Sequence, residues 1–380
     1  MSRYFVTVAR GLENIAAGEL SAIGSTQTQC VPGGVYFEGD QSTLYKAHLW
    51  MRTGNRIFLP LRDFPARNPD ELYEGIIKFR WETFLTGKKT FAIDCTISGQ
   101  HNPDLNHSQY AKLRVKDAIV DRLREKTGGR PDVDVENPDI SISVYIRDGH
   151  CTLNMDATGG SLHERGYRSP DAAAPLKETL AAGLIALTEW DGKTPFIDPM
   201  CGSGTLPIEA TLKAANLAPG LLRDSFSFMN WPDYFEPRWK ELKEEALSKV
   251  ISVSPGQIFG FDQNASALSA AKESMKLARI SEGKIEFARR RFEEFVLPEG
   301  LQPGVLIVNP PYGERLGDVE ELKVLYKLMG DTFKQKLKGW RAYIFTGNLE
   351  LAKHVGLKAS RRFELYNGAI DCRLLKYELY

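Results

Sequence analysis

The sequence has no excess of charge of either sign. Its 380 residues include 49 Lys and Arg against 49 Asp and Glu, so the formal net charge at pH 7 is zero. Proteins that coat nucleic acid carry a broad basic field, and this composition does not supply one. If RNA is the substrate, local basic patches must make the contact.

Long apolar runs are also missing. No stretch reaches the roughly 18 apolar residues of a membrane span, and residues 1–5 lack the pattern of a secretory signal. We therefore expect no membrane partner and a cytoplasmic location. A chain of this length is expected to form two or three domains, each with its own core.

Cysteine is scarce and unpatterned. The five cysteines are odd in number and scattered, without any CxxC pair, and the six histidines show no ligand spacing. This distribution favours reduced thiols and gives no reason to expect zinc or another metal. The cysteines are Cys30, Cys95, Cys151, Cys201 and Cys372.

The N-terminal part alternates between strand and helix patterns. Residues 4–8 and 35–39 have strand patterns, and residues 12–23 and 41–51 have helical spacing. This order predicts a small ferredoxin-like α+β domain over residues 1–65.

Residues 66–157 are predicted to form a second unit. Its expected elements are a helix over 69–79, a strand over 90–96, a long helix over 108–126, and strands over 140–146 and 151–156. Ser108 is the expected N-cap of the long helix, and the Gly128-Gly129 pair is expected to end it. Basic residues that include Lys112, Arg114 and Lys116 cover its polar surface. They form either a solvated helix face or a surface that contacts phosphates.

One turn indicates chemistry. The apolar, β-branched run 305–308 indicates a buried strand, and Asn309, Pro310, Pro311 and Tyr312 follow it directly. The two prolines must end the strand, at the sheet edge where α/β proteins bind ligands. The side-chain oxygen of Asn309 and the carbonyl of Pro310 can both accept hydrogen bonds from one flat NH2 group, and the ring of Tyr312 can stack on a planar base. The turn suits methylation of a nucleobase amine, although a plain strand-ending turn is the alternative.

A second strand pattern, over 194–198, leads into a glycine turn. It ends in Asp198, and Gly202 and Gly204 precede a helical pattern over 206–215. The glycines allow a tight turn and close backbone approach. No lysine follows as in a Walker A loop, so a nucleoside triphosphate is not expected. Asp198 stands where it could neutralise the ammonium group of adenosylmethionine.

The next strand pattern, over 257–262, ends in Asp262, which could accept both hydroxyls of a ribose. The usual spacing from glycine turn to acid is about 20 residues; here residues 216–256 intervene. The aromatic side chains of this insert form either a local subcore or a lid that stacks on a base. They are Phe226, Phe228, Trp231, Tyr234, Phe235 and Trp239.

The C-terminal end of the chain predicts how the sheet closes. Asn367 and Gly368 separate two strand-like runs, which is a strong hairpin signal. A closing antiparallel hairpin on a parallel sheet distinguishes class I methyltransferases from dehydrogenases. After a break at 158–161, residues 158–380 are thus expected to form an α/β, Rossmann-like domain with a seven-stranded sheet.

Two resemblances sharpen these expectations. Residues 108–121 resemble the THUMP domain of bacterial RNA-modifying enzymes, which holds the RNA near a catalytic domain. GYR at 166–168 with APLKETLAA at 174–182, DPMCGSGTLPIEA at 198–210 and NPPYGERLG at 309–317 together resemble ribosomal RNA large-subunit guanine-N2 methyltransferases of the RlmL type. Longer members of that family carry a second methyltransferase domain after the region that matches this sequence. The 7-methylguanosine activity found in those fusions is therefore not expected here.

The resemblance implies roles for individual residues. Asn309, Pro310, Pro311 and Tyr312 would be catalytic. Contacts to S-adenosyl-L-methionine would come from Pro175, Leu176, Lys177, Glu178, Asp198, Pro199, Cys201, Gly202, Ser203, Gly204, Thr205, Asp262, Gln263, Arg291 and Phe292. RNA would be contacted by Lys112, Arg114, Lys116, Tyr167, Arg168 and Arg315.

Arg291 departs from the family pattern. Related enzymes commonly have Asp at this place, where it binds the adenine amino group, and an Arg cannot accept that hydrogen bond. A backbone amide or stacking on Phe292 would then serve adenine. Alternatively, Arg289 to Arg291 contact RNA phosphates.

Other functions remain open at this level. A transfer-RNA guanine-N2 methyltransferase could share the same motifs, and NPPY also suits the N6 amine of adenine in DNA or a protein glutamine. The THUMP-like half argues against the last two. A non-catalytic RNA-binding assembly factor is the alternative of a different class, and Arg291 is its best support.

Overall fold

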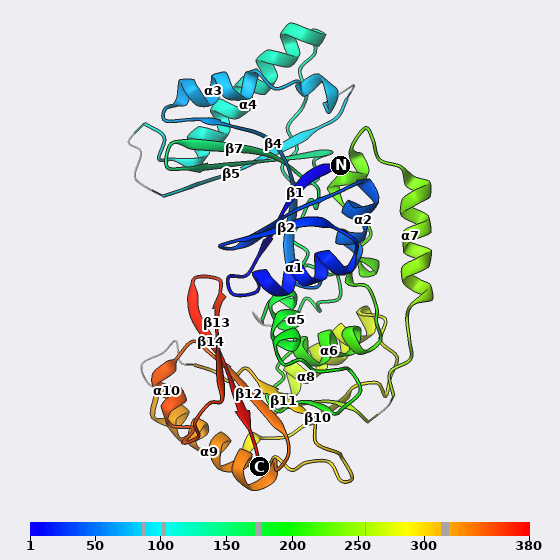
Figure 1. Cartoon of the computed structure of the whole chain (residues 1–380), viewed down its shortest axis with the longest axis vertical. Helices are drawn as coiled ribbons and strands as arrows, with labels where there is room; N and C mark the ends of the chain where they lie inside the picture. The colour runs from blue at the N-terminus through cyan, green and yellow to red at the C-terminus, as the bar shows by residue number, and fades with distance from the viewer. Residues whose placement is uncertain (86–87, 100–103, 172–175, 255, 313–318) are drawn as a thin grey trace.

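The computed structural model describes the chain except for residues 86–87, 100–103, 172–175, 255 and 313–318. The N-terminal half lies at one end of the molecule and the C-terminal half at the other (Figure 1). The elements of the N-terminal half are β1 (Ser2–Val8), α1 (Glu13–Ala22), β2 (Thr26–Val31), β3 (Gly34–Gly39), α2 (Gln41–Trp50), β4 (Gly54–Pro65), α3 (Pro69–Ile77), η1 (Trp81–Thr83), β5 (Phe91–Ser98), α4 (Ser108–Thr127), β6 (Ile140–Arg147) and β7 (His150–Asp156).

The strands described in this half form one continuous sheet, in the order β2-β3-β1-β4-β7-β6-β5. The long strand β4 joins its two parts, because it pairs antiparallel with β1 and also with β7. At Phe58 the strand has Phe5 on one side and Asp156 on the other. Sequence patterns missed β2 and β4. In β4, Pro60 and a register shift between Pro60 and Arg62 interrupt the alternation that marks a strand.

The long helix predicted over 108–126 is α4, and one stripe of its apolar residues faces the core. Ala111, Val115, Ile119 and Leu123 are all buried. Gly128 ends the helix in the left-handed conformation, as expected. The predicted N-cap was wrong by one position, since His107 occupies that place without a side-chain capping bond and Ser108 is the first helical residue.

The C-terminal half contains the second sheet. Its elements are α5 (Glu178–Leu187), β8 (Phe196–Asp198), α6 (Thr205–Ala214), η2 (Pro219–Leu222), η3 (Ser227–Asn230), α7 (Glu236–Ser248), β9 (Ile258–Asp262), α8 (Ala265–Leu277), β10 (Glu286–Arg289), η4 (Phe292–Glu294), β11 (Val305–Val308), α9 (Val319–Lys336), β12 (Arg341–Thr346), α10 (Leu349–Lys353), β13 (Arg361–Asn367) and β14 (Ile370–Glu378).

Among the described residues this sheet has seven strands, in the order β10-β9-β8-β11-β12-β14-β13. Strands β10, β9, β8, β11 and β12 are parallel to one another. In the closing β13–β14 hairpin, β14 pairs antiparallel with β12, and β13 pairs antiparallel with β14. The predicted α/β fold with a closing hairpin is confirmed. All four residues of β11 are buried, as expected of a strand covered on both faces.

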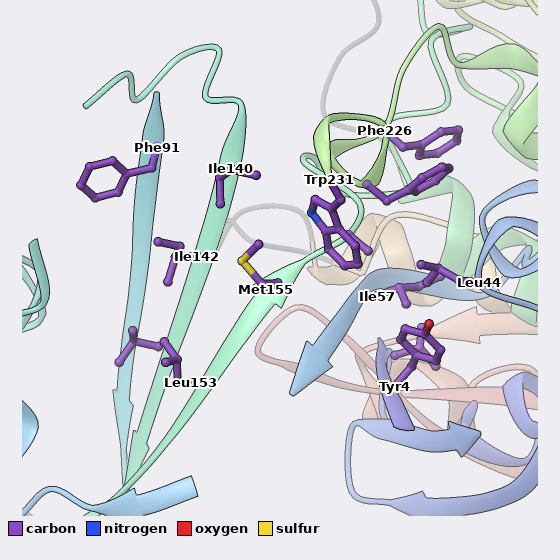
Figure 2. Packing of buried hydrophobic residues seen from close by; sticks show 14 of the residues in the cluster. Tyr4, Leu44, Ile57, Phe91, Ile140, Ile142, Leu153, Met155, Phe226 and Trp231 are labelled. Carbon is purple, nitrogen blue, oxygen red and sulfur yellow. The ribbon is translucent and has the colours of Figure 1, made fainter. Parts of the chain in front are cut away.

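The insert between α6 and β9 packs against the N-terminal half. Its aromatic side chains belong to the same buried cluster as Tyr4, Leu44 and Ile57, and Figure 2 shows Phe226 and Trp231 beside these residues.

Stacking between the insert and helix α2 supports this attachment. Phe228 stacks on Tyr45 of α2 at 4.8 Å between ring centroids, and Trp239 meets the same ring edge-on at 5.7 Å. The lid interpretation is therefore wrong for Phe226, Phe228, Trp231 and Trp239, which are buried. The insert joins the two halves instead.

Buried polar contacts also join the halves. The Arg165 guanidinium donates through Nη2 to the backbone oxygen of Arg52 at 2.6 Å and through Nε to Glu209 Oε1 in α6 at 2.8 Å. Arg52 in turn donates to the backbone oxygen of Leu217 at 2.8 Å. None of the described helices is both long and apolar enough to cross a membrane.

Candidate active site

The turn after β11 lies in the middle of the sheet. Strand β11 pairs with β8 on one side and with β12 on the other, so Asn309 stands at the carboxyl edge next to Asp198 at the end of β8. Asn309 is half-buried. Its Oδ1 atom is buried without a hydrogen-bond partner in the described part of the chain. A buried acceptor left without a donor costs free energy. Such atoms are rare in native structures, and a role in binding or catalysis is one reason for them.

The rest of the turn is held from both sides. Pro310 is buried. The backbone oxygen of Tyr312 accepts from Asn348 Nδ2 at 3.3 Å, and its hydroxyl accepts from Asn367 Nδ2 at 3.2 Å. The ring of Tyr312 is thereby tied to the elements that follow β12 and β13.

The glycine turn joins two strands of the sheet. The Gly202 amide donates to Asp262 Oδ2 at the end of β9 at 2.8 Å, and the Cys201 amide donates to the backbone oxygen of Phe261 at 2.8 Å. Gly204 begins α6 with φ of +79°, a left-handed conformation that favours glycine. The turn thus holds its backbone close to the carboxylate of Asp262.

Asp198 is almost fully buried. Its Oδ1 accepts from the Met200 amide at 3.1 Å. Burial raises the pKa of this carboxyl to about 8, and the nearby charge of Asp262 adds to the shift. A cationic ligand beside this carboxyl would stabilise its ionised form, which burial disfavours.

Two cavities adjoin the turn, and Asn309 and Met200 line both of them. A cavity of about 250 Å³ is lined by Asp171, Leu176, Asp198, Met200, Cys201, Gly202, Ser203, Thr205, Leu206, Asn264, Ser266, Ala267 and Asn309. A cavity of about 550 Å³ is lined by Pro199, Met200, Asp262, Gln263, Arg290, Phe292, Glu293, Asn309, Pro311, Glu321, Leu322 and Leu325.

The cavities gather most of the predicted cofactor residues. Lys177 is exposed and lies next to the lining residue Leu176. Glu178 is buried, receives a hydrogen bond from Arg168 Nε at 3.0 Å, and has a pKa raised by burial. Gly204 is not among the lining residues. Pro175 and Arg315 lie outside the described residues.

Arg291 does not line either cavity and is exposed. Its neighbour Arg290 does line the larger one, and the Arg290 guanidinium lies over the Phe261 ring at 4.6 Å. Of the three consecutive arginines, Arg290 therefore takes the place at the cavity that the sequence pattern gave to Arg291. Glu293 also lines this cavity, and it supplies a carboxylate close to the place where the family pattern expects one.

Several lining residues had no sequence signal of their own. Glu321, Leu322 and Leu325 come from α9, which folds back over the sheet edge after β11. Asn264 caps α8 by accepting from the amides of Ser266 and Ala267, so its cap role could be predicted but its place in the cavity could not.

The predicted RNA residues have mixed placements. Lys112 pairs with Asp94 at 3.8 Å, Arg114 with Asp70 at 3.0 Å and Lys116 with Asp117 at 3.4 Å. All three keep about a third or less of their side chains exposed.

Tyr167 requires a correction. It is buried, and its hydroxyl donates to Glu209 Oε1 at 2.9 Å, so it is part of the core and not of an RNA-binding surface. Arg168 is one third exposed and pairs with Glu178 at 2.7 Å. Among the described residues, no group of three or more His, Cys, Asp or Glu side chains is placed to hold a metal ion.

Comparison with known proteins identifies the architecture. Residues 165–376 match the family described as RMKL-like, methyltransferase domain. The chain belongs to the RMKL-like methyltransferase family. Residues 66–156 match the THUMP domain, and residues 3–58 match the RlmL ferredoxin-like domain.

Relatives share this organisation. The chain is 42% identical over 377 residues to slr0064 of Synechocystis sp., a candidate RNA methyltransferase, with 99% of this chain and 97% of the relative covered. It is 40% identical over 386 residues to ribosomal RNA large subunit methyltransferase K/L of Syntrophotalea carbinolica, covering 99% of this chain but 53% of that protein. The chain spans about half the length of the K/L relatives it matches.

A solved structure agrees with the fold of this RMKL-like methyltransferase. The crystal structure of SMU.472, a candidate methyltransferase complexed with SAH, matches with a TM-score of 0.90 at 31% identity. The match covers 100% of this chain and 98% of that chain.

The glycine turn of the RMKL-like domain gives a matched pair of variants. A Cβ at Gly204 would lie 2.9 Å from both Ala271 and the Phe287 ring, whereas a Cβ at Gly202 would meet no atom within 4 Å. Both residues have positive φ. We expect Gly204→Ala to lower the free energy of unfolding by about 2–4 kcal/mol, since crowding adds to backbone strain.

Gly202→Ala should lower the same quantity by only about 1–2 kcal/mol, because it has the strain without the crowding. Denaturant unfolding followed by circular dichroism measures both. Equal losses for the two variants would show that crowding at Gly204 does not matter.

Proposed function

We propose that this protein transfers the methyl group of S-adenosyl-L-methionine to the exocyclic N2 of a guanosine in 23S ribosomal RNA, giving N2-methylguanosine. The observation that carries the proposal concerns Asn309, which lines both cavities: its buried Oδ1 atom has no hydrogen-bond partner among the residues that the structure describes. A flat amine is the donor that such an acceptor lacks. SAH in the related crystal structure and the names of the relatives support the cofactor and the RNA.

The residues present fit the cofactor. The smaller cavity would take its methionine end, with Asp198 near the ammonium group and Gly202 and Ser203 as backbone contacts. Asp262 would hold the ribose, and Phe292 lines the larger cavity where adenine would lie. When bound, adenosylmethionine supplies an electrophilic methyl group.

The chain's own residues position the nucleophile. The lone pair of a guanine N2 is delocalised into the ring, so the amine is a poor nucleophile until acceptors draw on its protons. Asn309 Oδ1 and the Pro310 carbonyl accept hydrogen bonds from the two N2 hydrogens, which stay on the nitrogen, and Tyr312 stacks on the base. Extruding the base from its stack costs roughly a few kcal/mol, and alignment of the reactants then supplies much of the barrier reduction. The methylated amine loses its extra proton to water.

The RNA would be held by the N-terminal half. The THUMP match covers residues 66–156, and the insert fixes this half against the methyltransferase domain through Phe228 and Trp239. We retain Lys112, Arg114, Lys116 and Arg168 as proposed RNA contacts. Their intramolecular carboxylate partners would have to be exchanged for phosphates.

The direct test is transfer of a labelled methyl group to fractionated unmodified RNA, followed by nucleoside analysis. We expect N2-methylguanosine in 23S ribosomal RNA. The label in transfer RNA instead would make the protein a transfer-RNA guanine-N2 methyltransferase. The label in N6-methyladenosine would reject the proposed amine, and failure to bind adenosylmethionine would favour a non-catalytic RNA-binding factor.

Cofactor affinity should depend on pH through Asp198. Its pKa in the folded protein, about 8, is above the value of roughly 3.9 for an unfolded aspartate. A cationic ligand binds the ionised form, so affinity should rise with pH between 6 and 8 by up to about tenfold per pH unit, with release of a proton. The contribution of this group to stability has the opposite trend: it is complete below about pH 4 and is lost as pH rises to about 8.

Calorimetric titration of S-adenosylhomocysteine at pH 6, 7 and 8, in buffers of different ionisation enthalpy, measures both the affinity and the released proton. Asp198→Asn removes the titrating group and should give weaker, nearly pH-independent binding. The same pH slope in wild type and variant would exclude Asp198 as the source.

A further inference from the structure

Two amide side chains outside the NPPY motif hold its aromatic residue. Asn348 follows β12, and Asn367 ends β13. Their Nδ2 atoms donate to the backbone oxygen of Tyr312 at 3.3 Å and to its hydroxyl at 3.2 Å. The two contacts lie at opposite ends of the residue, so together they restrict both its backbone and the direction of its ring.

The orientation of Asn348 is determined by its other bonds. Its Oδ1 accepts from the amides of Glu350 and Leu351, each at 3.1 Å, and so caps α10. With the oxygen engaged there, the Nδ2 group must face Tyr312. The backbone N–H of Asn348 also donates to Thr346 Oγ1 at 3.0 Å, and this buried hydroxyl is within 2.8 Å of Tyr326 Oη.

The hairpin that carries Asn367 is held by the ferredoxin-like domain. The Arg10 guanidinium lies over the Tyr366 ring at 5.0 Å from its centroid. A Cβ at Gly11 would lie 2.1 Å from the backbone oxygen of Glu364, so the turn between β1 and α1 lies directly against β13. Figure 1 shows the red β13–β14 hairpin reaching the blue N-terminal part of the chain.

We propose that Asn348 and Asn367 are positioning residues that fix the ring of Tyr312 for stacking on the target base, with Asn367 acting through the tyrosine hydroxyl. The inference rests on the proposed function, because Tyr312 is the stacking residue there. In this proposal the β13–β14 hairpin closes the sheet and also supports the substrate site. Arg10 of the N-terminal half contacts the hairpin at Tyr366.

A double-mutant cycle between Asn367 and Tyr312 tests the proposal. Asn367 is not in a left-handed conformation, so Leu can replace it without backbone strain. We expect Asn367→Leu to lower kcat for methyl transfer to RNA by about tenfold to a hundredfold through loss of alignment. In a Tyr312→Phe background, which has no hydroxyl to hold, the same substitution should change kcat by no more than about twofold.

Two further variants separate positioning from folding. Asn367→Asp can still accept a hydrogen bond from the Tyr312 hydroxyl and should recover most of the activity. Asn348→Asp keeps the oxygen that caps α10 but loses the donor to Tyr312, so it should lower kcat while the melting temperature stays near wild type. Binding of S-adenosylhomocysteine should be unchanged in all of these proteins.

Equal losses from Asn367→Leu in the two backgrounds would overturn the proposal, because a merely structural residue does not depend on the hydroxyl. The free energy of unfolding of the wild type, Asn367→Leu, Tyr312→Phe and the double variant gives a readout that needs no activity. A loss of stability in the double variant that differs from the sum of the two single losses supports the contact, and equality with that sum rejects it. Absence of methyl transfer by the wild-type protein would instead be a failure of the proposed function, and the unfolding cycle would then decide the inference.

Discussion

Replacing Asn309 by Ala should abolish methyl transfer while the cofactor still binds. Asn309 lines both cavities, and its buried Oδ1 atom has no hydrogen-bond partner in the described part of the chain. In the proposed mechanism this oxygen accepts a hydrogen bond from the target amine. Loss of one preorganised hydrogen-bond group in an active site typically costs about a hundredfold to a thousandfold in kcat. We expect at least this loss here, because no other side chain at the turn offers a second amide oxygen.

The measurement combines single-turnover transfer to RNA with calorimetric titration of S-adenosylhomocysteine. Asn309→Asp is the matched control, since it keeps an acceptor oxygen at the same place and should retain more activity than Asn309→Ala. Wild-type turnover by the Ala variant would remove Asn309 from the mechanism. Loss of cofactor binding along with turnover would mean that the side chain shapes the cavity and does not act on the amine.

Removing Glu209 should destabilise the protein even more than the substitution at Gly204. The Glu209 carboxylate receives hydrogen bonds from Arg165 Nε at 2.8 Å and from the Tyr167 hydroxyl at 2.9 Å. The side chains of Arg165 and Glu209 are 2% and 0% exposed. Glu209→Ala leaves a buried guanidinium without its counter-ion, which costs about 3–5 kcal/mol of unfolding free energy.

Two other variants set the scale for this loss, one at the same site and one at an exposed ion pair elsewhere. Tyr167→Phe removes one hydrogen bond and should cost about 1 kcal/mol. Glu320→Ala breaks the exposed pair with Lys323 and should leave the unfolding curve close to that of wild type, as expected for a surface ion pair. Denaturant unfolding of the three variants ranks their losses of unfolding free energy. A loss for Glu209→Ala that is no larger than the loss for Tyr167→Phe would contradict the prediction.

The effect of Glu209→Ala should extend across the two halves of the molecule. Arg165 also donates to the backbone oxygen of Arg52 at 2.6 Å in the ferredoxin-like part. An uncompensated guanidinium would pull away from this contact. Limited proteolysis near residues 158–161 should therefore be faster in Glu209→Ala than in wild type at the same temperature.

Local sequence patterns determined the elements and the position of the chemistry. The run 305–308 with its two prolines, the Gly202 and Gly204 turn and the Asn367-Gly368 hairpin each act through their own backbone preferences. Such preferences do not depend on distant partners, and the structure has a strand, a helix start and a hairpin at these places. The closing hairpin, and with it the fold class, followed from the sequence for the same reason.

Tertiary structure alone decided which polar and aromatic residues are buried and where. Tyr167 is in the core because Glu209 reaches it from α6, the insert aromatics bury themselves against Tyr45 of another domain, and Asn367 reaches Tyr312 across the sheet edge. Each of these placements depends on a partner 42 to 183 residues away, as the numbers of the paired residues show. Composition and periodicity report only neighbours along the chain, whereas the free energy of burying a polar group depends on what lies opposite it.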